Sequence, residues 1–134
     1  VSIRTCSVRA LAQVEDPRAL EILIAASKDK DPGVRQLAIQ TLSQFEGSRA
    51  AGAASDALMD PDPNVRLAAV RVLGKMGSPG PVRSLIAALA DRREIIRVEA
   101  VWALEKLTGE GFGNNPERWK QWWNSRQKTA TVKP

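Results

Sequence analysis

Few residue types in this chain could support catalysis. The sequence has no histidine and a single cysteine, Cys6. Histidine is the usual general base near neutral pH and the commonest metal ligand, and Ser-His and Cys-His nucleophiles depend on it. One cysteine can form neither an internal disulfide nor a thiolate zinc site. We therefore expect no catalytic residues, no bound metal and no cofactor.

Three short features imitate ligand sites. The segment 60–64 begins like a calcium loop, but a valine follows it where the loop needs glycine, and Arg71 stands where the loop needs glutamate. The glycines of segment 109–113 precede no βαβ unit, so they predict a flexible linker and not a dinucleotide loop. Cys6 has no histidine to activate it. We interpret the side-chain oxygens of segment 60–64 as helix caps and Cys6 as a packing residue.

The composition describes one globular unit of 134 residues, 43% hydrophobic, with 20 basic and 15 acidic side chains. No stretch approaches the roughly 20 apolar residues of a membrane helix, and no signal-peptide pattern is present. Five cations and one acid give residues 115–134 a net charge of +4, which leaves +1 for residues 1–114. A nucleic-acid groove needs cations concentrated along one face, so nucleic acid is not the expected partner.

A 31-residue repeat organises the chain. An aliphatic–arginine pair recurs at Ile3-Arg4, Val34-Arg35, Val65-Arg66 and Ile96-Arg97. Small or apolar residues follow each aliphatic position at offsets of 4, 8 and 11, which trace one face of an α-helix. A second apolar stretch lies between successive copies, at 20–26, 51–58 and 82–89. Each unit is therefore predicted to be a helical hairpin.

Proline pairs mark where several helices should begin. An Asp-Pro or Asn-Pro pair places a capping side chain before a proline at the first helical position, where the missing N–H costs nothing. Such pairs stand at residues 16, 31, 62 and 115. No segment predicts a strand. We expect helices near residues 2–14, 17–27, 32–45, 49–59, 63–76, 79–90, 94–107 and 116–124.

The pattern Asp-x-Asp-Pro-x-Val-Arg-x-x-Ala-x-x-x-Leu occurs at residues 29–42 and 60–73. It resembles HEAT repeats, specifically the short HEAT-like repeats of the phycobilisome-lyase type. The resemblance implies an all-α fold, a right-handed α-solenoid of about four 31-residue hairpins over residues 1–108. It also implies a polar ladder between repeats, formed by Asp29, Asp60, Asp91, Arg35, Arg66 and Arg97. The third copy departs from the pattern, with Arg93 and Glu94 in place of Asp-Pro.

The two ends of the chain break the period. Residues 109–124 carry three tryptophans and resemble the terminal segment of many bacterial HEAT-like proteins, so we expect a capping helix there. Residues 125–134 lack apolar periodicity and are predicted to be disordered. The first arginine-bearing helix has no partner helix before it. We expect upstream repeats, self-association or another molecule at that edge.

The resemblance places the arginine-bearing helices on the concave side, where two rows of side chains would face a partner. The rows are Arg9, Gln40, Arg71 and Trp102, and then Gln13, Gln44, Lys75 and Lys106. They suggest a partner that bears carboxylates or amides, with Trp102 as an aromatic platform. Two alternatives stay open. The rows can be ordinary solvated positions, and Trp102 can pack beneath the cap with the other tryptophans, which we favour for that residue.

These features favour a non-catalytic scaffold that binds a protein or peptide through its concave face. Two alternatives rest on resemblance: a subunit or relative of a bilin lyase, and a base-excision enzyme, for which Glu99 beside Trp102 is the one suitable pair. A third is nucleic-acid binding by the basic C-terminal tail. Di-iron HEAT-like proteins use His-Glu motifs, and the absence of histidine excludes that chemistry.

Overall fold

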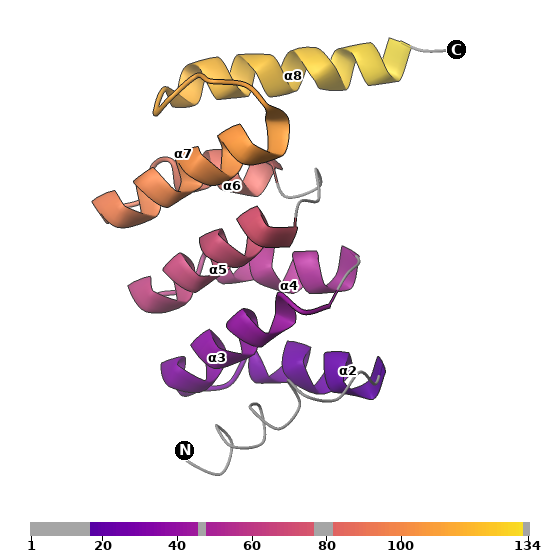
Figure 1. Cartoon of the computed structure of the whole chain (residues 1–134), viewed down its shortest axis with the longest axis vertical. Helices are drawn as coiled ribbons and strands as arrows, with labels where there is room; N and C mark the ends of the chain where they lie inside the picture. Colours follow the sequence, from indigo (N-terminus) through magenta and orange to yellow (C-terminus); the bar gives the residue numbers. More distant parts are fainter. Residues whose placement is uncertain (1–16, 46–47, 77–81, 133–134) are drawn as a thin grey trace.

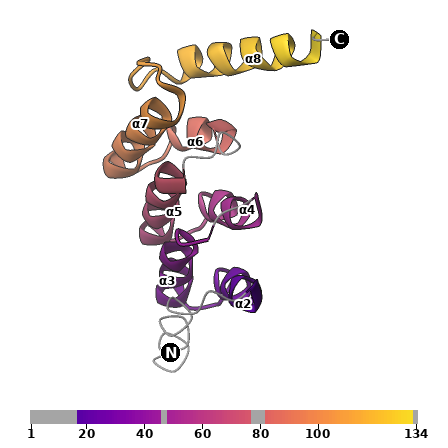
Figure 2. The ribbon, with the colours of Figure 1, turned by 45° about the vertical axis from the view of Figure 1, so that its right-hand side comes forward.

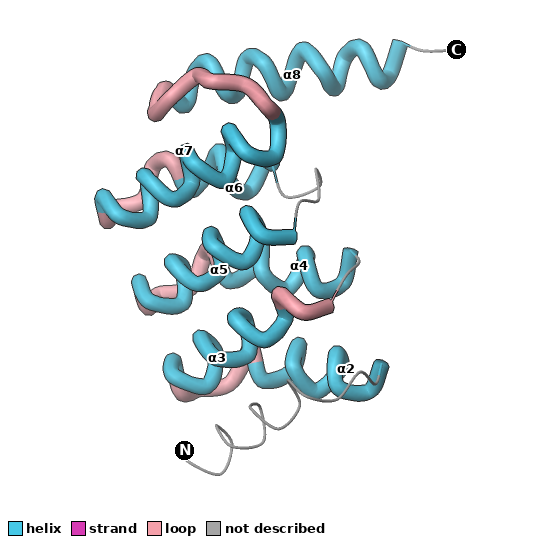
Figure 3. The backbone as a smooth tube through the Cα atoms, in the orientation of Figure 1, coloured by secondary structure: helices cyan, strands magenta, loops and turns pink. Residues whose placement is uncertain are grey.

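A computed structural model describes residues 17–45, 48–76 and 82–132. These residues form helices and turns, with no strand among them (Figure 3). The expected helix at 2–14, with Cys6, lies outside this described part. The helices are α2 (Pro17–Ala26), α3 (Pro32–Leu42), α4 (Ser48–Ala57), α5 (Pro63–Met76), α6 (Val82–Ala88), α7 (Glu94–Thr108) and α8 (Pro116–Val132).

The helices form two layers. In one layer α3 packs against α5 and α5 against α7, so the three lie side by side in chain order (Figure 1). In the other layer α2 packs on α3, α4 on α5 and α6 on α7 (Figure 2). Helix α8 lies across the end of the stack and contacts α6. This all-helical stack of hairpins is the expected α-solenoid.

Side-chain caps begin three of the helices at the expected Asx-Pro pairs. Asp31 accepts a hydrogen bond from the Gly33 N–H at 2.7 Å, and Asp62 accepts one from the Asn64 N–H at 2.8 Å. At the start of α8, Asn115 accepts from the next two free backbone N–H groups at 3.1 and 3.2 Å. The oxygens of the calcium-like segment 60–64 are thus engaged in capping and turn bonds.

Helix α7 begins without a side-chain cap. Arg93 occupies the cap position in an extended conformation, and its side chain makes no capping hydrogen bond. The turn is nevertheless retained, because Asp91 accepts a hydrogen bond from the Arg93 N–H at 2.9 Å and the Arg97 N–H reaches the Arg93 carbonyl at 3.2 Å. Glu94 places a negative charge in the first turn, which also favours a helix N-terminus.

The predicted apolar columns form the core. The aliphatic position, the position four later and the position eight later are buried in all three described copies: Val34, Val65, Ile96, Ala38, Ala69, Ala100, Leu42, Leu73 and Leu104. The position eleven residues after the aliphatic one is less buried, since Phe45 and Leu107 are only partly enclosed. Positions outside the stripe, such as Ile39, Val70 and Ala103, are buried as well. The helices of this layer bury a wider arc than one stripe, because each contacts a partner helix and its layer neighbours.

An arginine–aspartate ladder joins the repeats. Arg35 donates to the Asp29 carbonyl of its own turn at 2.8 Å and, through Nε and NH2, to both carboxylate oxygens of Asp60 in the next repeat at 2.8 and 3.1 Å. Arg66 repeats this arrangement, with the Asp60 carbonyl at 2.9 Å and the Asp91 carboxylate at 2.7 and 3.4 Å. Each bidentate pair is largely enclosed, with 9% of either aspartate side chain exposed.

The last arginine of the ladder closes only on its own turn. Arg97 donates to the carbonyls of Asp91 at 2.7 Å and Arg92 at 3.1 Å. One repeat length further on, the position of the next aspartate is occupied by Trp122. The ladder therefore ends where the cap begins.

The cap closes the stack with aromatic packing. Trp119 of α8 is fully buried, and its indole N–H donates to the Gly113 carbonyl at 2.7 Å. Phe112 meets Trp119 edge-on with ring centroids 4.9 Å apart. Gly109 ends α7 in the left-handed region at φ 76°, which costs glycine little. The glycine segment is thus a turn fixed by hydrogen bonds and ring contacts.

Helix α8 is longer than predicted. It continues to Val132, whereas we expected it to end near residue 124 and the chain to be disordered from residue 125. The sequence from 117 to 132 has no proline or glycine and includes several strong helix formers, so nothing local ends the helix. Apolar periodicity fades after Trp123, which is why the pattern missed this extension.

The Asp91 carboxylate interacts with arginines of the ladder. Desolvation by burial raises its pKa, but the hydrogen bond from the Arg93 N–H, the hydrogen bond and charge of Arg66 and the charge of Arg97 lower it more. The net effect places the pKa of Asp91 below its ordinary value.

Stability should therefore fall as the solution is acidified through the Asp91 pKa. A carboxyl whose pKa is lower in the folded state stabilises the fold above its unfolded pKa of about 3.9 and loses that contribution as pH falls through the folded pKa. We expect Asp91→Asn to lower the free energy of unfolding by about 1–2 kcal/mol near neutral pH. Urea unfolding across the acidic range should show this difference shrinking below about pH 4. A difference that stays constant on acidification would contradict the ladder's charge role.

Candidate functional site

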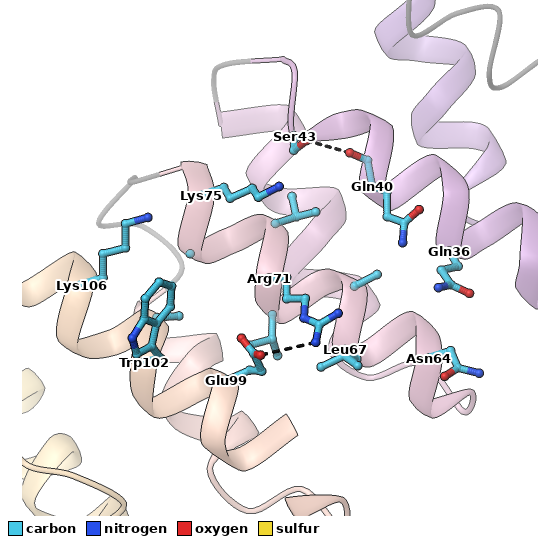
Figure 4. Close-up of a pocket in the computed structure, with 15 residues that line it drawn as sticks. Gln36, Gln40, Ser43, Asn64, Leu67, Arg71, Lys75, Glu99, Trp102 and Lys106 are labelled. Carbon is cyan, nitrogen blue, oxygen red and sulfur yellow. Dashed lines mark hydrogen bonds and ion pairs between the residues drawn. The ribbon is translucent and has the colours of Figure 1, made fainter. Parts of the chain in front are cut away.

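A hollow of about 450 Å³ crosses the layer of α3, α5 and α7 (Figure 4). Its lining residues come from these three helices and from Ser43 just after α3. None comes from α2, α4 or α6, so the hollow opens on the face that the second layer leaves uncovered. We call this hollow and its rim the groove.

The groove collects five of the eight side chains predicted to face a partner: Gln40, Arg71, Lys75, Trp102 and Lys106. Gln44 is exposed but does not line it, because α3 ends at Leu42 and Gln44 lies in the following turn. Arg9 and Gln13 lie outside the described residues. The inter-repeat ladder is separate from the groove, and its six residues do not line it.

The favoured expectation for Trp102 was wrong. Its side chain does not pack beneath the cap but lines the groove, where 64% of the residue is exposed. The aromatic cluster of the cap consists of Phe112, Trp119, Trp122 and Trp123. The physical reason is the helix period: Ala103 and Leu104 occupy the buried side of α7, so the preceding residue points outward.

Cations dominate the charge of the groove. Lys75 extends from the last turn of α5, and Lys106 extends from the last turn of α7 with its Nζ 5.5 Å from the centre of the Trp102 ring. The Arg71 NH2 lies 3.5 Å from a carboxylate oxygen of Glu99, which links α5 to α7 (Figure 4). Glu99 is the one carboxylate among the lining residues. The groove can thus bind carboxylates and amides and can stack or pack apolar groups on Trp102.

The close approach of α5 and α7 sets the floor of the groove. A Cβ added to Gly74 would lie 3.2 Å from the Cβ of Ala103, so glycine and alanine at these positions let the helices meet closely. Both residues line the groove. A larger side chain at either position would separate the helices or fill the hollow.

Several lining residues lie outside the two predicted rows, including Gln36, Asn64 and Leu67. Gln36 and Leu67 stand four residues before Gln40 and Arg71, so they share a helix face with them. Extending the predicted rows by one helical turn toward the N-terminus would have found them. Asn64 lies a further three residues back on α5 and follows the same rule.

Among the residues that the structure describes, no group of three or more Cys, Asp or Glu side chains is placed to hold a metal ion. Within the same ranges, no helix is both long and apolar enough to cross a membrane.

Comparison with known proteins identifies the repeat. A family model of HEAT repeats matches residues 2–58 and again residues 53–114. The two matches span the ladder and the groove. A search of curated proteins finds no match to this chain.

The buried Trp119 and the exposed Trp102 should respond very differently to truncation. Trp119→Ala should lower the free energy of unfolding by about 3–5 kcal/mol, because it empties a buried site. Trp102→Ala should change it by no more than about 0.5 kcal/mol, because the side chain is already exposed. Chemical unfolding followed by circular dichroism measures both. Equal losses would show that Trp102 belongs to the core.

Proposed function

Because the chain belongs to the HEAT-repeat family, whose members are generally scaffolds for protein interactions, we propose that it binds a protein or peptide partner in the groove of α3, α5 and α7, without catalysis. The observation that carries this proposal is the convergence of side chains from three successive repeats on one hollow. A partner in that hollow would contact all three helices at once, which is how solenoid surfaces bind extended ligands.

Exposed cations on a single helix are usually solvated positions with no role in binding. In this structure, however, the cations of α5 and α7 share the hollow with an exposed tryptophan. Tryptophan and arginine are enriched at the energetic centres of interfaces. The combination favours recognition.

The basic tail is a weaker candidate site. Arg118 lies over the Phe112 ring at 5.4 Å, and Arg126 lies over the Trp122 ring at 5.1 Å. The first contact joins α8 to the segment before it and the second lies within α8, so both favour a structural role for these cations. The finer resemblance to phycobilisome-lyase repeats stays a prediction, and a visible absorption change on adding a bilin would support it.

Charge reversal in the groove should abolish partner capture. We expect the full chain, used as bait in lysate of the source organism with and without nuclease treatment, to retain a protein partner in both. Lys75→Glu combined with Lys106→Glu should reduce its recovery about tenfold or more, equivalent to about 1.4 kcal/mol or more of binding free energy. Quantitative mass spectrometry of the retained proteins measures this.

Lys28→Glu combined with Arg83→Glu is the matched control. It makes the same change in charge at two exposed positions that do not line the groove. The control should retain the partner, and both variants should melt cooperatively. A partner retained equally by all three proteins would place the binding surface outside the groove, and capture that disappears with nuclease would favour nucleic acid.

A further inference from the structure

Helix α7 carries a stripe of exposed apolar side chains that starts at the groove, and Trp102 is the member of the stripe that lines it. Ile95 is 47% exposed, Val98 55% and Trp102 64%, and they are three of the five large apolar residues exposed in the described chain. Their spacing of three and four residues places them on one face of α7. Because Trp102 lines the groove, the stripe continues the groove toward the start of α7. Grouped apolar exposure of this kind marks an interaction surface.

The equivalent positions in earlier repeats are more polar. The position of Val98 is Leu67 on α5 and Gln36 on α3, and the position of Trp102 is Arg71 on α5. The side chains at these positions therefore change along the stack, from an amide on α3, through a mixture on α5, to Val98 and Trp102 on α7, where the charged Glu99 and Lys106 also line the groove. A partner that matches it must differ in chemistry from one end to the other.

The same groove has an excess of positive charge. Its lining contains Arg71, Lys75 and Lys106 against Glu99 alone. Neither lysine has a carboxylate partner among the residues that the structure describes. Both ammonium groups are therefore available to a partner, and the Lys106 Nζ, 5.5 Å from the centre of the Trp102 ring, places a positive charge next to the apolar stripe.

We propose that the occupant of the groove is an acidic segment of a partner protein that also carries aliphatic or aromatic side chains, an inference that rests on the proposed function. The apolar side chains of the segment cover Ile95, Val98 and Trp102. Its carboxylates bind Lys75 and Lys106, the charge complementarity that the groove offers. A nucleic acid would supply the negative charge but no aliphatic groups for the Ile95 and Val98 surface, so the protein partner is favoured.

Glu99 competes with an acidic partner for Arg71. Its carboxylate lies 3.5 Å from the Arg71 guanidinium, so it occupies the third cation of the groove and repels an acidic partner. A partner carboxylate must compete with it. Removal of its charge should therefore strengthen binding, an effect that a purely apolar docking surface would not show.

The probe is a library of random linear peptides displayed on phage and selected on the full chain, with counter-selection only on the immobilisation surface. Enriched sequences should combine an excess of Asp and Glu with aliphatic or aromatic residues. A synthetic peptide of the enriched sequence is then titrated by fluorescence anisotropy. We expect about tenfold or greater weakening in Lys75→Glu, Lys106→Glu and in Val98→Asp, and about two- to fivefold strengthening in Glu99→Gln.

The Lys28→Glu, Arg83→Glu variant is again the matched control and should bind like the unaltered chain. Enriched peptides that are basic or uncharged but still lost in Val98→Asp would overturn the acidic-partner inference and leave peptide binding by the groove intact. Peptides that ignore every groove change would count against both. An absence of enrichment overturns the inference alone, because partner capture tests the proposed function. Tighter binding of single-stranded oligothymidylate than of any peptide would also overturn it.

Discussion

An arginine recurs in each described repeat, and in two of the three it holds two neighbouring turns together. Its guanidinium donates to a carbonyl of its own turn, and in Arg35 and Arg66 the other edge binds both carboxylate oxygens of the next aspartate. That aspartate in turn accepts a backbone N–H two residues on. Arginine suits this role because its planar fork reaches a carboxylate bidentately while a third N–H binds elsewhere. The start of each helix in the α3, α5 and α7 layer is thereby fixed relative to the previous one.

This constraint determines where the groove side chains lie. Because the bonded turns set the register between neighbouring helices, equivalent positions along α3, α5 and α7 come side by side on the uncovered face. The repeat conserves the ladder and core positions and varies the groove positions, from glutamine on α3 to arginine on α5 and tryptophan on α7. The groove side chains can thus differ from repeat to repeat without disturbing the ladder or the core.

The 31-residue period predicts most of the architecture, because apolar spacing, Asx-Pro caps and the aspartate–arginine pattern all indicate the same helices. It does not predict two features of the structure. The exposure of Trp102 depends on whether α8 covers that face of α7, and the position of α8, which packs on α6, does not follow from the repeat. The length of α8 depends on the absence of a stop signal, and not on a buried stripe. In the groove, Gln40 and Arg71 followed from the repeat, whereas the Arg71–Glu99 contact required the actual spacing of two helices.

The central claim is that the exposed face of α7, with Trp102 at its centre, is the recognition surface. The most direct test is the indole N–H region of a nitrogen-15 correlation spectrum, recorded with and without the captured partner and assigned by Trp102→Phe. The account predicts that the Trp102 signal shifts or broadens on binding, while the signal of the buried Trp119 keeps its position. Changes confined to the tryptophans of α8, with Trp102 unmoved, would contradict it.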